Sequence, residues 1–209
     1  MKKIWKKIKN SRIVKVLFAR KAVVVCIVIL LIMVLAAIFA PLVAPYDPYQ
    51  QDLRNMLMGI SPEHLLGTDS MGRDLLSRII YGGRVSFTVG LVSVLVAGGL
   101  GMILGLIAGM AGGIIDSIIM RIMDAMMSVP MIIMALFLGS ILGKGLGNIC
   151  LAIGISMIPS YARVTRGQVL TVREMDYITA GTLCGASKLK NTLLHILPNC
   201  ISSNIVLMT

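Results

Sequence analysis

Long charge-free stretches limit what this 209-residue chain can fold into. They cover residues 22–43, 85–115, 125–143 and 145–162, and most of their side chains are apolar. About 20 apolar residues suffice for a helix to cross a bilayer. Charged residues make up only 14% of the chain, whereas soluble domains carry about 25%. The sequence therefore predicts a protein embedded in a membrane rather than a soluble domain.

We predict an all-α fold, a polytopic bundle of transmembrane helices with four spans and an incomplete fifth. Pro130 and Pro159 are tolerated inside spans because neighbouring helices can satisfy the freed backbone groups. The last stretch has about half the length of a crossing, which predicts either a short packed segment or a fragment of a longer protein, and we favour the fragment. The predicted spans are residues 22–43, 85–111, 122–143 and 148–165, with residues 198–209 beginning the fifth.

The net charge of +11 is concentrated in a basic tail, residues 1–21, which contains no acidic residue. Basic residues beside a span favour the cytoplasmic side and anionic lipid, and we predict no nucleic-acid binding because the tail lacks an aromatic platform. The tail also resembles the start of a signal peptide, but the following apolar run exceeds the usual 7–15 residues. We therefore predict an uncleaved first span in the cell membrane with the N-terminus in the cytoplasm.

This orientation fixes the side of every connecting segment. Residues 44–84 form an extracytoplasmic loop with an amphipathic helix, and residues 144–147 form an outer turn. Residues 112–121 form a cytoplasmic loop, and residues 166–197 form a second cytoplasmic segment with an excess of basic residues, as the positive-inside rule requires.

The extracytoplasmic loop contains a predicted helix start. Thr68, Asp69 and Ser70 are suitable N-cap residues for a helix over residues 72–86. The helical spacing of its apolar residues predicts one apolar face at the membrane border. The segment is either a solvated helix leading into the second span or part of a substrate entrance, and the spacing favours the former.

Four glycines in and after the second predicted span are spaced four residues apart. Residues four apart lie on one helical face, and glycine allows another helix to approach closely. We predict a packing seam between transmembrane helices; a sliding surface for gating is the alternative. The glycines are Gly101, Gly105, Gly109 and Gly113.

Three ionisable residues stand at the inner border of the second and third spans. Asp116, Arg121 and Asp124 raise the possibility of a proton relay, as ionisable residues near a membrane do. Arg121 and Asp124 are three residues apart, so we favour a simple ion pair between them on one helix.

The chain lacks the patterns that indicate catalysis. Its two histidines, His64 and His195, are predicted on opposite sides of the membrane, and its four cysteines form no CxxC pair. The stretch over residues 139–145 resembles a phosphate loop but has no Ser or Thr after Lys144. We predict no catalytic residue, no metal site and no cofactor in this chain.

A charged, helix-patterned segment, residues 176–199, separates two apolar regions. We predict a helix over residues 177–194 with a break at Gly181 or Gly185, ended by Pro198. Lys188, Lys190 and Asn191 would face water. The segment either docks on a partner protein or lies flat on the inner leaflet. Its predicted apolar stripe is Tyr177, Ala180, Cys184, Leu189 and Leu193.

This segment resembles the EAA loop of ABC-importer permeases, whose pattern is E-A-A, three residues, G, nine residues and I-x-L-P. Thr179, Ala180 and Gly181 occupy the first slots, Gly185 the glycine slot, and Leu197 and Pro198 the last pair. Residues 66–86, 108–130 and 161–170 are also similar to the peptide/nickel branch, in the expected order. The chain is similar to the C-type permease subunit of dipeptide, oligopeptide and nickel importers.

The resemblance implies a MetI-like permease that pairs with a second permease subunit, two cytoplasmic ATP-binding subunits and an extracellular substrate-binding protein. ATP and Mg would be held by the ATP-binding subunits. The implied ATPase-coupling residues are Asp176, Tyr177, Thr179, Ala180, Gly181, Gly185, Ala186, Lys188, Leu197 and Pro198. The family motif of the outer loop comprises Gly67, Thr68, Asp69, Gly72, Arg73 and Asp74.

The predicted function is import of di- or oligopeptides or nickel by alternating access, driven by separate ATPase subunits. A truncated, non-transporting fragment or a structural membrane subunit is the alternative. An enzyme is not expected.

Overall fold

The computed structural model describes residues 21–208, so the predicted basic tail lies outside the described residues except for Lys21. The chain divides into two compact units, residues 1–87 and residues 88–209. In the described part of the chain the secondary structure is helical apart from one isolated β-bridge, between Thr68 and Asp74. The predicted all-α membrane fold is confirmed.

The first unit begins with α3 (Lys21–Ile38) and α4 (Ala40–Val43), which together cover the predicted first span. The helix breaks at Phe39 because Pro41 has no N–H to donate to the preceding turn. Pro41 instead lies in the first turn of α4, where that donor is not required. Most of the α3 surface is exposed and apolar, as expected for a helix that faces lipid.

A long irregular segment follows, with one 3₁₀ turn, η1 (Leu53–Asn55), before α5 (Leu75–Ala111) begins. The predicted N-caps Thr68, Asp69 and Ser70 are wrong, because Asp74 caps α5 by accepting a hydrogen bond from the Ser77 N–H at 2.8 Å. Asp69 is occupied in its own turn, and Gly72 has a φ of +70°. The chain therefore cannot become helical before residue 75.

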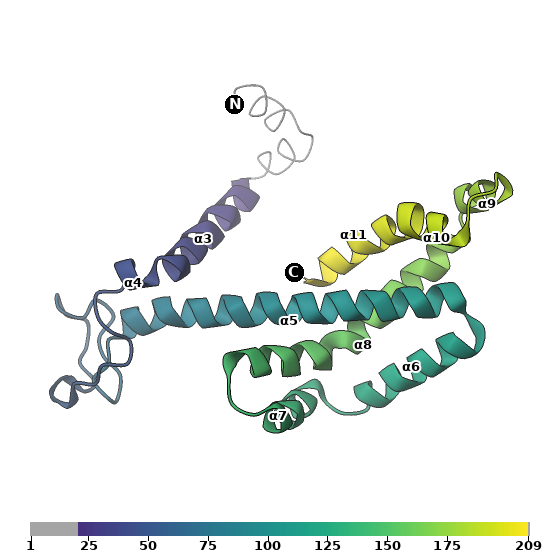
Figure 1. Ribbon diagram of the computed structural model, residues 1–209. Coiled ribbons are helices and arrows are strands. Elements are labelled where there is room, and N and C mark those ends of the chain that lie inside the picture. The colour runs from purple at the N-terminus through teal and green to yellow at the C-terminus, as the bar shows by residue number, and fades with distance from the viewer. Residues whose placement is uncertain (1–20, 209) are drawn as a thin grey trace. The chain divides into compact units, whose positions relative to one another are not determined.

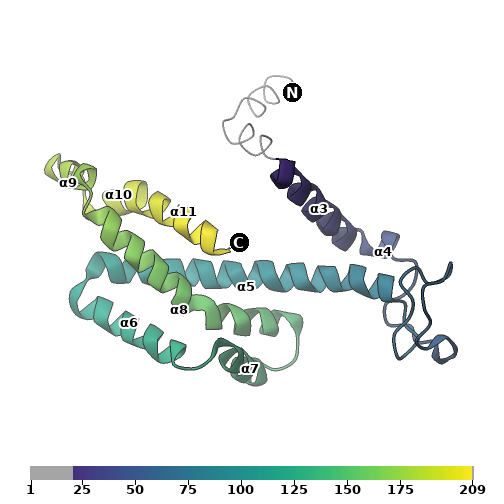
Figure 2. The ribbon, with the colours of Figure 1, turned by 180° about the vertical axis from the view of Figure 1, so that it is seen from behind.

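The second unit contains the rest of α5 and a series of helices gathered around α8 (Figure 1). Helix α8 contacts α6, α7, α9 and α11, and it carries more buried residues than any other described helix. The view from behind shows α11 running back along the bundle from the α9 end of α8 (Figure 2). The elements are α6 (Gly113–Met127), α7 (Met131–Leu142), α8 (Leu146–Arg173), α9 (Asp176–Leu183), α10 (Lys188–Asn191), the π-helical turn η2 (Thr192–Ile196) and α11 (Leu197–Met208).

Two predicted boundaries in this unit are wrong. Residues 112–121 form no loop, because Gly112 and Gly113, with φ of +64° and +53°, turn the chain directly into α6. The predicted span 122–143 is not one helix, since α6 and α7 are bent by 92° at the break between them. Pro130 causes this break, because proline disfavours helical geometry in the residue before it.

The segment after the coupling region is predicted to start at Pro198, and α11 starts one residue earlier, at Leu197; helix is nevertheless continuous across this boundary. Proline lacks the N–H that would bond to the carbonyl one turn earlier, and its ring crowds that carbonyl. Before the proline the helix widens into the π-turn η2, in which the Leu197 N–H donates to the Thr192 carbonyl. The helix then continues into α11. A π-turn before proline thus preserves the helix.

Two described helices, α3 and α5, are long and apolar enough to cross a membrane, and a third crossing arises if the bent pair α6 and α7 acts as one span. At 37 residues, α5 is about 55 Å long, which exceeds the roughly 30 Å hydrocarbon core. The predicted span 148–165 lies within α8 and stays a prediction.

The predicted glycine seam joins α5 to α8 at three of its four positions. A Cβ on Gly101 would lie 2.5 Å from the Tyr161 Cβ, and one on Gly109 would lie 2.6 Å from the Val169 Cγ1. A Cβ on Gly105 would overlap the Ala162 carbonyl oxygen. Gly113 is wrong as a seam residue: no atom lies within 4 Å of its hypothetical Cβ, and it serves the turn into α6.

Buried polar side chains fasten α11 to α8. Asn204 donates from Nδ2 to the Thr165 hydroxyl at 2.9 Å and to the Cys200 carbonyl at 2.9 Å. Asn204 and Thr165 are fully buried. The Asn204 Oδ1 lies 3.2 Å from the same hydroxyl, whose single hydrogen also has the Tyr161 carbonyl as an acceptor at 2.8 Å.

Arginine side chains connect α8 to α5 and α6. Arg166 donates two hydrogen bonds to the Asp116 carboxylate, at 2.5 and 2.6 Å, and Arg173 donates one to the Gly109 carbonyl at 3.0 Å. Asp124 pairs with Arg163 rather than with Arg121, so the predicted Arg121–Asp124 pair is wrong. Asp116 and Asp124 therefore each pair with an arginine of α8, which favours a role in helix packing over the proton relay.

The seam predicts opposite effects for two glycine substitutions in α5. Gly105→Ala places a methyl group against backbone of α8 and should destabilise the protein by about 1–3 kcal/mol, the usual cost of overpacking. Gly99→Ala is the matched control, because no atom lies within 4 Å of its hypothetical Cβ, and it should stabilise the helix by up to about 1 kcal/mol. Thermal unfolding of the detergent-solubilised protein measures both; equal shifts would contradict the seam.

Candidate functional site

The predicted coupling segment is a short helix held between two sharp turns at the end of α8. Helix α9 ends in a Schellman motif: the Gly185 N–H donates to the Thr182 carbonyl, and the Ala186 N–H donates to the Gly181 carbonyl, both at 3.0 Å. Gly185 has a φ of +86°, which glycine adopts without strain. The predicted break is therefore at Gly185, while Gly181 lies inside α9.

The next helix starts two residues later. The Ser187 hydroxyl accepts from the Lys190 N–H at 3.3 Å and caps α10. The sequence Gly-Ala-Ser thus ends one helix and starts another within three residues.

The outer face of the α9–α10 pair is exposed and partly apolar. Tyr177 is 47% exposed, Leu189 is 68% exposed and Leu183 is 84% exposed. Sequence reasoning missed Leu183, the last residue of α9, because it does not belong to the predicted apolar stripe. Of the predicted residues, Asp176, Thr179, Ala180 and Lys188 are also exposed.

The inner face of α9 is anchored by a small apolar cluster. Ile178 is buried with Val169 and Val172 of α8 and with Ile196 and Cys200 beyond the turn. Sequence reasoning missed Ile178 as the anchor because the predicted stripe followed Tyr177 and Ala180 instead. This cluster joins α9 to both α8 and α11.

Polar contacts reinforce that anchor. The prediction that Asn191 faces water is wrong, because its side chain is only 4% exposed and donates to the Thr182 hydroxyl at 3.0 Å. Its burial follows from the Gly185 turn, which folds α10 back toward α9. At the other edge, Asn199 donates to the Tyr177 hydroxyl at 3.3 Å, and the rings of Tyr177 and His195 meet edge to face.

In the first unit, the outer motif is organised around Asp69. Its carboxylate accepts from the N–H groups of Met71 and Arg73 at 2.8 and 3.0 Å, and it pairs with the guanidinium groups of Arg73 and Arg78. Desolvation raises the pKa of Asp69, but these hydrogen bonds and the Arg73 charge outweigh it and hold the pKa at about 2. The carboxylate therefore remains ionised and fixes the turn.

Asp74 forms the second centre of this motif. Besides capping α5, it accepts from the Ser77 hydroxyl at 2.7 Å and pairs with His64 Nδ1 at 3.0 Å. Desolvation raises the pKa of Asp74, yet the bonds from Ser77 and His64 outweigh it and lower the pKa below its ordinary value. Ser77 in turn accepts from the Tyr46 N–H at 3.1 Å, so the loop is tied to the helix start at two points.

The remaining motif residues serve close backbone packing. Thr68 accepts from the Met58 N–H at 2.9 Å and donates to the Asn55 carbonyl. A Cβ on Gly67 would overlap the Met58 carbonyl oxygen, and a Cβ on Gly72 would overlap the Asp52 carbonyl. The motif therefore maintains a compact loop, and the structure brings all six of its predicted residues together.

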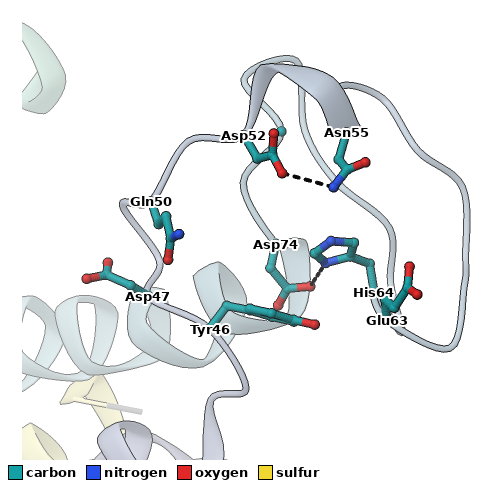
Figure 3. Close-up of a pocket in the computed structure, with 9 residues that line it drawn as sticks. Tyr46, Asp47, Gln50, Asp52, Asn55, Glu63, His64 and Asp74 are labelled. Atoms are coloured by element: carbon teal, nitrogen blue, oxygen red, sulfur yellow. Dashed lines mark hydrogen bonds and ion pairs between the residues drawn. The ribbon is translucent and has the colours of Figure 1, made fainter.

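A polar cavity of about 230 Å³ opens in this loop (Figure 3). His64 and Asp74 meet at its centre, with Tyr46 beneath them and Asp52 bonded to Asn55 above. Its lining also includes Asp47 and Glu63, which makes the cavity acidic. Over residues 21–208, no group of His, Cys, Asp or Glu has an arrangement that could hold a metal ion.

Comparison with known proteins finds two matching families. Residues 101–209 match the family described as binding-protein-dependent transport system inner membrane component, and residues 10–62 match the N-terminal TM domain of oligopeptide transport permease C. The two matches together extend over most of the chain, in the same order as the two compact units.

Individual relatives agree with these families. The chain is 40% identical over 181 residues to the dipeptide transport system permease protein DppC of Haemophilus influenzae, covering 84% of this chain and 61% of the relative. It is 39% identical over 183 residues to the di/tripeptide permease DppC of Pseudomonas aeruginosa, with 84% and 60% coverage. The glutathione permease GsiD of Escherichia coli is 39% identical over 177 residues, with 84% and 58% coverage. The chain spans about three fifths of the length of these relatives.

The low pKa of Asp69 predicts a pH-dependent loop. A carboxylate whose pKa falls from 3.8 to about 2 on folding stabilises the folded loop fully above its ordinary pKa. This contribution is lost as the pH falls from 3.8 toward about 2. Amide hydrogen exchange of residues 44–74, corrected for the intrinsic rate at each pH, should rise across that window and remain flat above it.

Asp69→Asn should reduce the rise in exchange between pH 3.8 and about 2 and should speed exchange at neutral pH. The part of the rise that remains in this variant comes from Asp74, whose pKa is also lowered. Asp47→Asn is the matched control, because Asp47 is exposed and accepts only a local bond from the Tyr49 N–H. A rise of unchanged size in Asp69→Asn would refute the assignment.

Proposed function

Because the chain belongs to the family of binding-protein-dependent transport system inner membrane components, we propose that it is a permease subunit of an ATP-binding-cassette importer. The observation that carries the proposal is α9, a helix whose inner face is anchored on α8 and whose outer face exposes Tyr177 and Leu183. Such a helix suits docking on a partner protein. In the proposed orientation the partner is a cytoplasmic ATP-binding subunit.

The mechanism we propose is mechanical coupling through α8. A force applied to α9 reaches α8 through Ile178 and its apolar cluster, because packed side chains move together. Helix α8 is in turn fixed to α5 by the glycine seam and to α6 by the Arg166–Asp116 pair. These contacts favour movement of the second unit as one body, the kind of motion that alternating access requires.

The assembly follows from the same family assignment. The proposed partners are a second permease subunit, two ATP-binding subunits, a substrate-binding protein outside the membrane, and membrane lipid. ATP and Mg belong to the ATP-binding subunits, and this chain supplies no catalytic group. The N-terminus lies in the cytoplasm in this proposal, which places α9 on the cytoplasmic side and the acidic cavity outside.

The substrate class we propose is small peptides. The relatives are named for transport of dipeptides, di/tripeptides and glutathione, and this favours a peptide-like substrate over nickel. Uptake of a radiolabelled dipeptide and of ⁶³Ni²⁺ by cells expressing the complete complex separates the two. Uptake of neither by a correctly assembled complex would favour the alternative of a non-transporting membrane subunit.

Charge reversal on α10 tests the docking role. Lys188→Glu with Lys190→Glu changes the exposed face beside Leu189 without touching a buried side chain, so the fold should persist. Co-purification of the ATP-binding subunits should fall, together with dipeptide uptake. Lys144→Glu, a charge reversal in the predicted outer turn, should leave both unchanged. Normal binding and coupled uptake in the α10 variant would refute the docking role.

The native cysteines test the orientation. Cys184 is exposed beside Gly185, whereas Cys150 and Cys200 are buried and Cys26 lies on the apolar helix α3. A membrane-impermeant maleimide should label Cys184 in inverted vesicles and not in spheroplasts. Cys184→Ser should abolish that labelling. Labelling from the outside would place α9 on the wrong side of the membrane for an ATPase contact.

A further inference from the structure

One buried polar atom in the second unit stands out. Of the buried side-chain oxygens and nitrogens in the described residues, the Oδ1 of Asn191 is the one without a hydrogen-bond partner. Asn191 is only 4% exposed, so water does not readily replace the missing donor. An unsatisfied buried acceptor is costly, and its position therefore needs a reason.

The nitrogen of the same amide explains why Asn191 is there. Nδ2 donates to the Thr182 hydroxyl at 3.0 Å and reaches the Ile178 carbonyl at 3.5 Å, and the Thr182 hydroxyl itself donates to that carbonyl at 2.9 Å. Turning the amide over would set its oxygen against the Ile178 carbonyl oxygen, so the hydrogen bonds fix the orientation. Asn191 on α10 thus holds α9 by its last turn.

The orphan oxygen faces Gly181. A Cβ on Gly181 would lie 3.2 Å from Oδ1 and 3.7 Å from Nδ2, so a methyl group there would press on the amide that holds the helix. Glycine in a helix interior normally costs about 1 kcal/mol relative to alanine in the free energy of folding. Gly181 thus leaves room for this amide at a cost in helix propensity, at a position where the permease pattern has alanine.

We propose, building on the coupling role proposed above, that Asn191 is the positioning residue that sets how α9 sits on the bundle, with Gly181 as its required counterpart. The two residues act as a pair across the Gly185 turn. Neither faces the outer surface of α9, so they act on the proposed partner only through the position of that helix.

The test is a double-mutant cycle read by amide hydrogen exchange of residues 176–183 in the full chain. Asn191→Ala should speed exchange of these amides by about tenfold, as expected for loss of a buried hydrogen bond. Gly181→Ala should speed exchange in the wild-type background. In the Asn191→Ala background the same substitution should slow exchange, by up to about fivefold, because alanine is the better helix former once the amide is gone.

Matched controls separate this pair from general effects. Gly167→Ala lies at an exposed interior position of α8 with no atom within 4 Å of its hypothetical Cβ, and it should slow exchange of α8 equally in both backgrounds. Thr182→Val removes the acceptor from an exposed residue and should loosen α9 as Asn191→Ala does. If Gly181→Ala has the same sign in both backgrounds, or if neither Asn191→Ala nor Thr182→Val loosens α9, the proposal is overturned.

A second readout distinguishes positioning from mere stability. In the assembled complex, Asn191→Ala should lower the dipeptide imported per ATP hydrolysed, while the amount of assembled complex stays the same. The Asn191→Ala, Gly181→Ala double variant should recover part of that ratio. An unchanged ratio with a loosened α9 would overturn the positioning role. A wild-type complex that imports no dipeptide would instead refute the proposed function, and the exchange cycle would still decide the pairing of Asn191 with Gly181.

Discussion

The second unit depends on the close approach of α5 to α8. Hydrophobic burial gives helices little reason to associate within lipid, so packing and polar contacts must supply the association. Gly101, Gly105 and Gly109 let the α8 backbone and the side chains of Tyr161 and Val169 fill the space where Cβ atoms would lie. Because the contact involves backbone, it has almost no freedom to adjust, and α8 is held along several turns.

That constraint gives α8 its central place. The same helix runs from the seam, past the ionic contacts of Arg166 and Arg173, to the turn before α9. The seam contacts of Tyr161, Ala162 and Val169, the charged Arg166 and Arg173, and the apolar anchor around Val172 all belong to α8. A displacement of α9 is thus delivered to a helix whose neighbours are fixed to it, which is the physical basis of the proposed coupling.

Sequence reasoning predicted what depends on composition and regular spacing, and it missed what depends on contacts between distant residues. Apolar length predicted α3 and α5 but joined α6 and α7 into one span, and the four-residue spacing predicted three glycines of the seam. The same spacing wrongly extended it to Gly113, since periodicity cannot show where a helix ends. The burial of Asn191 could not be predicted from a helical stripe, because it results from the Gly185 turn. Similarly, Asp74 caps α5 because the loop already engages Asp69.

Two buried asparagines show how differently the ends of this unit are built. The nitrogen of Asn204 donates to partners on two helices, Thr165 of α8 and Cys200 of α11, where α11 is fastened to α8. Asn191 satisfies only its nitrogen, and its oxygen lies unpaired beside Gly181. Asn191 connects α10 to the last turn of α9, and its unpaired oxygen lies where a Cβ on Gly181 would be 3.2 Å away. Removing the amide would therefore release the last turn of α9 and make room for a side chain at residue 181, which is why the role we propose for Asn191 is to position α9.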